Sequence, residues 1–230
     1  MGIGPMSTGA DRESISAGGT GPPSDTGPYD GDAHMTSKPD LTPAARRMAR
    51  LLAGVRDDQL TAPTPCPDMP LGALIDHIGG LSLAFTWAAA KRFPDGPSRP
   101  PSADAANLPP DWRTRFPERL EALAAAWRSP EAWEGMTEAG GVDMSGEEAG
   151  HVAINELVVH GWDLARASGQ PYDAGTDEID TCLAFVAPAV EQSGGQGIEG
   201  LFGPRVEIPD DAPALDRLIA LTGRAPSWAG

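Results

Sequence analysis

The stretch from Gly150 to Gly169 constrains the fold of this chain more than any other, because it has helical periodicity and carries two polar side chains on an apolar face. Glu156 and His160 are four residues apart, so a helix projects both from the same side. A carboxylate and an imidazole are costly to bury unless a partner compensates them, and a divalent metal ion would compensate both. The apolar residues that share this face are Ala149, Val152, Ala153, Leu157 and Leu164.

A second apolar helix is predicted over residues 71–90, and it contains His77. Apolar residues three before and four after His77 place it on the buried side of that helix. If the two helices pack side by side, His77, Glu156 and His160 converge in the core of a bundle. Two imidazoles and one carboxylate suit zinc, nickel or ferrous iron, and three protein ligands leave a coordination position open, as in catalytic sites. The ordinary alternative is a helix-surface pair between Glu156 and His160.

Two further polar residues of this helix, Asp163 and His151, lie near the candidate ligands in sequence. Asp163 follows His160 by three residues and lies on the same side of the helix. We expect it either to orient a metal ligand from behind or to pair at the surface with Arg166 or Lys91. His151 points away from the ligand pair and is interpreted as a surface residue of the first turn, not a ligand.

A cysteine and three arginines have alternative interpretations. Cys66 precedes the helix of His77, and a thiol near a helix N-terminus can be reactive or can bind a metal. Nothing basic is near Cys66 in the sequence, so a small apolar packing role is favoured. Arg46, Arg47 and Arg50 belong to a predicted helix at 42–55 and are interpreted as a solvated face, with an anion-binding rim as the alternative.

Composition excludes several classes of partner. The formal net charge of −16 over 230 residues argues against nucleic acid, whose phosphates require a basic face, and against anionic membrane surfaces. No apolar run is expected to have the length of a membrane span, and the N-terminus lacks a signal pattern. The two cysteines do not make a disulfide framework. We therefore expect a cytoplasmic protein.

The chain is expected to consist of a tail and one domain. Residues 1–39 have almost no large apolar side chains and are predicted to be disordered, with Met35 as a candidate start. Residues 40–230 are long enough for one domain with a sizeable core. Because helices outnumber any strand signal, an all-α bundle is predicted. Its helices are predicted at 42–55, 71–90, 111–127, 145–169, 176–193 and 212–221, with an extended segment at 204–209.

The helix of Glu156 has clear end signals. Ser145 and Glu148 match a capping box at its start, and Gly169 is a plausible C-cap at its end. Residues 93–110, in contrast, are rich in proline and are predicted to form neither helix nor strand.

Three segments carry a family resemblance. These segments are TPCPDMPLGALIDHIGGL around His77, NELVVHGWDLARASGQ around Glu156 and His160, and FGPRVEIPDDAPALDRLIALTGRAPSW near the end. The first two resemble the mycothiol-dependent maleylpyruvate isomerase family, within the DinB-like four-helix metalloproteins. The third is similar to the ending of one actinobacterial branch of that family. The likeness spans about residues 41–228.

The resemblance implies a DinB-like four-helix bundle with additional short C-terminal helices. It also implies a metal, usually zinc, held by His77, Glu156 and His160, with mycothiol as the thiol cosubstrate. Metal coordination would give a thiolate that adds to a small electrophile, as in a cis–trans isomerase, or is transferred to it, as in an S-transferase. DinB-like bundles often dimerise, so a homodimer is an open expectation.

Two differences from the family pattern bear on the substrate. Met69 stands where this branch often has tryptophan, and the chain is expected to lack the C-terminal sterol-carrier-like domain that supplies an arginine in the isomerase. Arg205 and Arg224 are candidates to bind an anion in its place. The alternative functions are a metal-dependent hydrolase that uses bound water, and a non-catalytic protein that binds a metal or ligand.

Overall fold

The computed structural model describes residues 38–67, 69–93, 103–198 and 201–230. Residues 1–37 lie outside this description, so a disordered tail and a start at Met35 stay predictions. Lys38 already contacts the folded part of the chain, because its Nζ donates to the Pro130 carbonyl oxygen at 3.0 Å.

Six α-helices and one two-stranded sheet make up the regular structure of the described residues. Every predicted helix is present, with bounds that differ from the predicted ones by at most two residues, and the all-α bundle is confirmed. The helices are α1 (Thr42–Gly54), α2 (Leu71–Ala90), α3 (Trp112–Ala126), α4 (Gly146–Ser168), α5 (Thr176–Gln192) and α6 (Ala214–Leu221). Single turns of 3-10 helix occur at Asp57–Gln59, Ala105–Asn107 and Pro130–Trp133.

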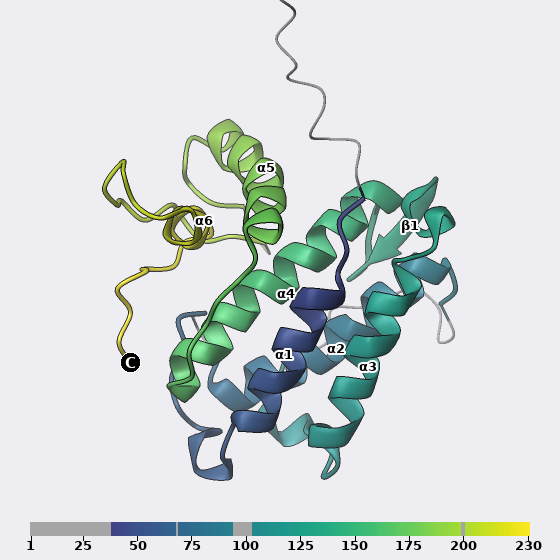
Figure 1. Ribbon diagram of the computed structural model, residues 1–230, viewed down its shortest axis with the longest axis horizontal. Helices are drawn as coiled ribbons and strands as arrows, with labels where there is room; N and C mark the ends of the chain where they lie inside the picture. Colours follow the sequence, from purple (N-terminus) through teal and green to yellow (C-terminus); the bar gives the residue numbers. More distant parts are fainter. Residues whose placement is uncertain (1–37, 68, 94–102, 199–200) are drawn as a thin grey trace, which may run out of the picture. The chain divides into compact units, whose positions relative to one another are not determined.

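Helices α1 to α4 form the bundle, in which α1 and α2 each pack against both α3 and α4. In Figure 1, α1 lies in front of α2, with α3 and α4 on either side. Helix α5 packs against α4, and α6 packs against α5. The apolar faces of the bundle helices meet in one continuous core, which includes Leu74, Phe116 and Leu157.

A β-hairpin between α3 and α4 was not predicted. Strands β1 (Met136–Ala139) and β2 (Val142–Ser145) pair antiparallel, and the turn between them consists of Gly140 and Gly141, with φ of 60° and 82°. Both φ values suit the tight hairpin turns that glycine allows. The strands are too short to show alternation, and β1 is held by tertiary contacts with α2 and α4. For example, Thr137 Oγ1 donates to the Ala88 carbonyl oxygen at 2.8 Å.

Two predicted connections have backbone hydrogen bonds that the sequence does not indicate. Within the described ranges the segment at 204–209 pairs with no strand, although the Val206 N–H donates to the Ala220 carbonyl oxygen at 3.0 Å. Residues 94–102 of the proline-rich connection at 93–110 lie outside the described residues. Its described part contains the 3-10 turn at Ala105–Asn107, which the Asp104 side chain caps by accepting from the Ala106 N–H. A single capped turn needs no helical periodicity, so helical spacing of apolar residues does not reveal it.

Helix α4 begins and ends as predicted. Ser145 Oγ accepts from the Glu148 N–H at 3.1 Å, and Glu148 Oε2 accepts from the Ser145 N–H at 2.8 Å. Gly169 closes the helix in the left-handed region, with φ of 71°. Both end signals are confirmed.

Helix α2 corrects the expectation about membrane spans. It is long and apolar enough to cross a membrane by length and composition, and it alone is so among the described residues. Of its most apolar window, 56% is buried against the rest of the protein. A core helix of a soluble protein passes the same test.

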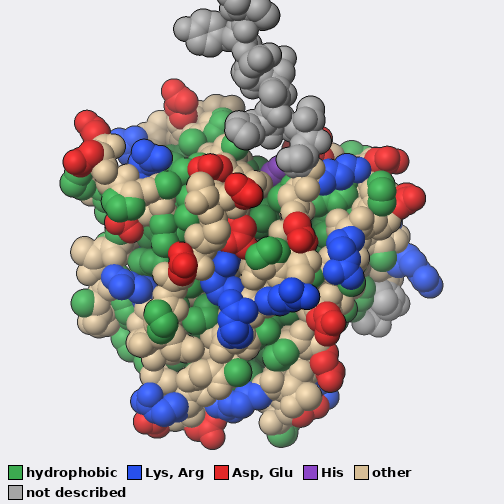
Figure 2. Space-filling view, in the orientation of Figure 1, with side chains coloured by type: hydrophobic (Ala, Val, Ile, Leu, Met, Phe, Trp, Pro, Cys, Tyr) green, Lys and Arg blue, Asp and Glu red, His purple; other side chains and the backbone are tan. Residues whose placement is uncertain are grey.

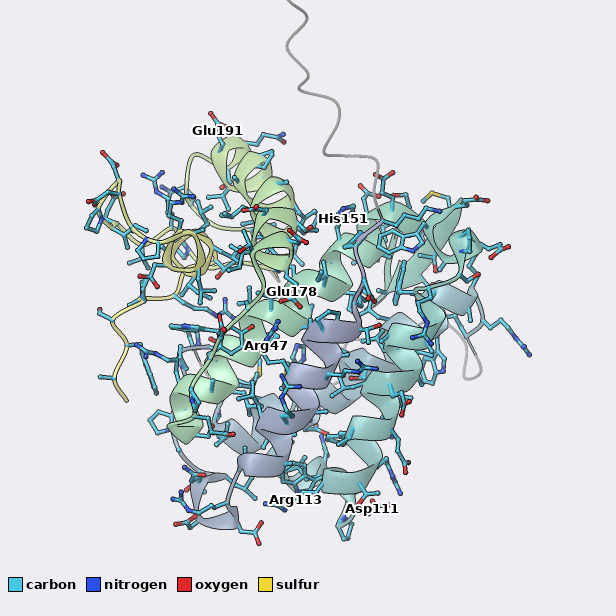
Figure 3. All side chains as sticks on the ribbon, viewed as in Figure 1. Arg47, Asp111, Arg113, His151, Glu178 and Glu191 are labelled. Atoms are coloured by element: carbon cyan, nitrogen blue, oxygen red, sulfur yellow. The ribbon has the colours of Figure 1, made fainter. Side chains whose placement is uncertain are left out.

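The prediction that Arg46, Arg47 and Arg50 form a solvated face is correct for two of these three residues. Arg46 and Arg50 are exposed, and basic side chains gather over α1 in Figure 2. Arg47 is instead buried, and its Nη2 lies 2.9 Å from Oε2 of Glu178 on α5. Figure 3 shows the two side chains approaching each other from α1 and α5. The sequence of α1 does not reveal that α5 returns to this side of the bundle.

Candidate metal centre

The adjacent helices α2 and α4 bring the three predicted ligands together. His77 Nε2 lies 3.3 Å from Oε2 of Glu156, and His160 Nε2 lies 3.1 Å from the same oxygen. The two imidazole rings meet edge to face, with centroids 4.9 Å apart. The predicted convergence of His77 with residues on a distant helix is therefore present in the fold.

The distances within this cluster fit a divalent ion. One ligand atom from each residue lies within 4.8 Å of the others. Tetrahedral zinc, with bonds of about 2.0–2.2 Å, places neighbouring ligand atoms about 3.3–3.5 Å apart. The separations of 3.3 and 3.1 Å from Glu156 to the two imidazoles are close to this range. The His77 side chain is 27% exposed and that of His160 is 9% exposed, so solvent reaches the cluster from the His77 side.

The side chains of the cluster shift the pKa values of Glu156 and His160 in opposite directions. Burial would raise the pKa of Glu156, but His160 and His77 outweigh burial and hold this pKa well below its usual range. Burial would likewise lower the pKa of His160, but Glu156 and Asp163 raise it to about 9. An imidazolium therefore lies beside a carboxylate at neutral pH, and a metal ion would have to displace the His160 proton.

Asp163 lies behind His160. It is fully buried, and its Oδ2 accepts a hydrogen bond from Nδ1 of His160 at 2.9 Å. Nε of Arg224 donates to Oδ1 and Oδ2 of Asp163 at 2.8 and 3.0 Å. Of the two interpretations of Asp163, the contact with a predicted ligand is the one that the geometry supports.

The predicted surface pair of Asp163 with Arg166 or Lys91 is absent among the described contacts, so this interpretation is wrong. Arg166 Nη2 donates to the Pro226 carbonyl oxygen at 2.9 Å, and Lys91 Nζ donates to the Ala132 carbonyl oxygen at 3.3 Å. Both basic side chains thus bind backbone oxygens, and Asp163 is fully enclosed.

Cys66 lies beside the Asp163–Arg224 pair. Its sulfur, a His160 nitrogen and an Asp163 oxygen are all within 4.8 Å of one another. Burial raises the pKa of the Cys66 thiol to about 11, and Arg224 opposes this rise only in part. The thiol is therefore protonated at neutral pH, in agreement with the favoured packing role. The nearby arginine comes from the far end of the chain, so no local signal revealed it.

The other candidate residues lie in different settings. Arg205 is exposed, and its Nη2 lies 3.1 Å from Oε1 of Glu207, so an anion-binding role stays a prediction for it and for Arg224. His151, which Figure 3 labels on α4, is half-buried, so its predicted surface position is correct only in part. Its ring lies between those of Trp133 and Phe185, with centroid distances of 6.0 and 6.1 Å. The hairpin and its preceding turn bring Trp133 to this position.

Comparison with known proteins identifies the family. The model of the mycothiol maleylpyruvate isomerase N-terminal domain matches residues 41–165. This chain belongs to that family. The matched region of this chain contains His77, Glu156, His160 and Asp163. Arg224 lies beyond the end of that region.

Relatives and solved structures agree with this assignment. Two uncharacterized proteins of Mycobacterium tuberculosis, from strains CDC 1551 / Oshkosh and ATCC 25618 / H37Rv, are each 32% identical over 190 residues, covering 76% of this chain and 91% of theirs. A crystal structure of the mycothiol-dependent maleylpyruvate isomerase has a TM-score of 0.58 at 17% identity, covering 84% of this chain and 89% of that one. Its histidine-to-alanine mutant has a TM-score of 0.52 at 18% identity, covering 70% and 71%. At these identities the two structures establish a shared fold.

Proposed function

We propose that this family member is a cytoplasmic, metal-dependent enzyme that uses mycothiol to isomerise or thiolate a small electrophile. The observation that carries the proposal is the convergence of His77, Glu156 and His160 on one point of the bundle. Membership of a family named for a mycothiol-dependent isomerase supports the thiol as cosubstrate. Zinc is the proposed metal, because two imidazoles and one carboxylate with an open position are typical of catalytic zinc.

The chain's own residues would divide the work between holding the metal and shaping its surroundings. His77 and His160 would supply neutral imidazole nitrogens, and Glu156 would supply the carboxylate oxygen that lies between them. Asp163 would hold the Nδ1 proton of His160 and so direct Nε2 to the cluster. When bound, the zinc would lower the pKa of a coordinated thiol, which gives a nucleophile at neutral pH. The thiol and the electrophile would approach from the exposed His77 side.

The first experiment is the metal content of the purified protein, measured by mass spectrometry. We expect about one zinc ion per chain in the wild type and a loss of that zinc in His77→Ala and His160→Ala, with helix content by circular dichroism unchanged. His151→Ala is the matched control, because this histidine lies on α4 but outside the cluster, and it should keep its zinc. Stoichiometric metal in purified His160→Ala would show that the ligand set is wrong.

The second experiment separates the proposed activity from its alternatives. Turnover of maleylpyruvate and of other small electrophiles is measured with and without mycothiol, on protein of known metal content. Turnover that requires both metal and thiol supports the proposal. Turnover without thiol would instead indicate a hydrolase that uses bound water, and metal binding without any turnover would indicate a binding protein.

A further inference from the structure

The imidazole of His160 faces two clusters with its two nitrogens. Nε2 lies 3.1 Å from Oε2 of Glu156, whereas Nδ1 lies 2.9 Å from Oδ2 of Asp163. On the Nδ1 side, Cys66, His160 and Asp163 place a sulfur, a nitrogen and an oxygen within 4.8 Å of one another. These donors are themselves a metal-ligand set, because thiolate, imidazole and carboxylate all bind zinc-like ions.

A guanidinium already holds the carboxylate of this second cluster. Arg224 is 7% exposed, and its Nε donates to Oδ1 and Oδ2 of Asp163 at 2.8 and 3.0 Å. Its Nη1 donates to the Thr222 carbonyl oxygen at 2.9 Å, which fixes the plane of the group. The same guanidinium lies near enough to Cys66 to oppose in part the rise that burial causes in the pKa of the thiol. Arg224 thus binds the Asp163 carboxylate and acts electrostatically on the Cys66 thiol.

The physical reason for a cation at this position is the burial of Asp163. A fully buried carboxylate is strongly destabilising unless a cation and hydrogen bonds compensate it. Arginine supplies both permanently, because its guanidinium does not lose its proton in proteins. With Arg224 bound, Asp163 still accepts from His160 Nδ1, and this hydrogen bond leaves Nε2 as the nitrogen directed at Glu156 and His77.

We infer that Arg224 is a fixed cation that takes the place of a second metal ion among Cys66, His160 and Asp163, and thereby positions His160 toward the first cluster. Arg224 is a positioning residue in this arrangement, since it acts through Asp163. The effect on the first cluster rests on the proposed function, whereas the latent second site does not. The two parts are therefore tested separately.

The latent site is tested with cadmium in the His77→Ala background, in which the first cluster lacks a ligand. We expect the double variant His77→Ala, Arg224→Ala to bind about one Cd²⁺ per chain. The bound ion should show the ultraviolet charge-transfer absorbance of a cadmium–thiolate bond. The Cys66 thiol proton is released to solvent as the sulfur–cadmium bond forms. The triple variant that also carries Cys66→Ser should lack this absorbance. The matched control is His77→Ala, Arg205→Ala, which removes an exposed arginine and should not gain the absorbance.

Two further variants keep the cadmium test decisive. Arg224→Gln keeps an N–H donor for Asp163 but carries no charge, so it should also gain the cadmium site, and it replaces Arg224→Ala if that variant does not fold. Arg224→Lys keeps the charge and should bind no cadmium. The inference is overturned if the folded Gln or Ala variant gains no cadmium, or if His77→Ala alone already binds cadmium through Cys66.

The positioning effect is tested in the chain with His77 intact. Arg224→Lys preserves the charge but replaces the planar guanidinium, which binds Asp163 and the Thr222 carbonyl oxygen together, with a flexible ammonium group. Its zinc affinity in competition with a chelator should therefore fall by about tenfold or more. Arg205→Ala should keep wild-type affinity. Unchanged zinc affinity in Arg224→Lys would refute the positioning effect. Absence of zinc from the wild type would refute the proposed function and leave the cadmium result standing.

Discussion

At the scale of single residues, two buried ion pairs join distant parts of the described chain. Asp163 on α4 is bound by Arg224 after α6, and Arg47 on α1 is bound by Glu178 on α5. A buried charge without such a partner costs several kcal/mol. Removing one partner of either pair is therefore expected to destabilise the protein strongly.

The pair of Arg47 and Glu178 gives a prediction about stability. Their side chains are 10% and 8% exposed, so Arg47→Ala leaves Glu178 buried without its cation. We expect the free energy of unfolding in urea to fall by roughly 3–5 kcal/mol. The double variant Arg47→Met, Glu178→Leu should recover much of this loss, because no uncompensated charge remains buried.

The matched control for this prediction is Arg50→Ala on the same helix. Arg50 is exposed, and we expect its removal to change the free energy of unfolding by no more than about 0.5 kcal/mol. If Arg47→Ala costs no more than Arg50→Ala, the buried pair does not stabilise the attachment of α5 to the bundle.

At the scale of elements, the start of α4 fixes the register of the candidate site. The capping box of Ser145 and Glu148 ends the hairpin and begins the helix that carries Glu156 and His160 about three and four turns further on. The Ser145 N–H and hydroxyl hold the pKa of Glu148 below its ordinary value, because both hydrogen-bond the charged form. The ionised capping box therefore stabilises the folded state.

This lowered pKa predicts a pH-dependent contribution to stability. Glu148→Ala should lower the free energy of unfolding at pH 7 by about 0.5–1 kcal/mol. Because the folded-state pKa is depressed, the contribution of Glu148 is fully present above about pH 5 and is lost as the pH falls below about 4. Urea unfolding of both proteins across pH 3–7 checks this, and a difference that grows toward acid pH would contradict it.

At the scale of the whole molecule, the candidate metal centre joins two helices of the four-helix bundle. His77 lies on α2, whereas Glu156 and His160 lie on α4, and these helices pack against each other. An ion held by all three side chains would bind the folded bundle and not the unfolded chain, since the unfolded chain does not bring the helices together. Metal binding should therefore stabilise the entire domain.

A free zinc concentration of about one hundred times the dissociation constant should raise the free energy of unfolding by about 2.7 kcal/mol. For a domain of this size this corresponds to an increase in Tm of roughly 5–10 °C, measured by calorimetry on protein first stripped of metal. A chelator should reverse the increase. The same increase in His160→Ala would mean that zinc stabilises the fold through other residues.

The sequence by itself determined the helices and the faces that they bury. Helix bounds follow from local signals, such as the capping box of α4 and Gly169 at its end, and local signals need no knowledge of the fold. The three candidate ligands were found because polar side chains at helical spacing within apolar stripes are conspicuous. Helical periodicity places His77 and Glu156 on the buried faces of their helices. Because both faces pack into the same core, the side chains of the three candidate ligands converge there.

Only the tertiary structure decided which distant residues complete the site and the core. Arg224 and Asp163 are 61 residues apart, and Arg224 lies in a terminal segment without periodicity that would mark it as buried. Arg47 has the same neighbours in sequence as the exposed Arg46, and only the return of α5 with Glu178 separates their environments. Such pairings depend on how whole helices pack against each other, because the cost of burying a charge is set by what surrounds it in space.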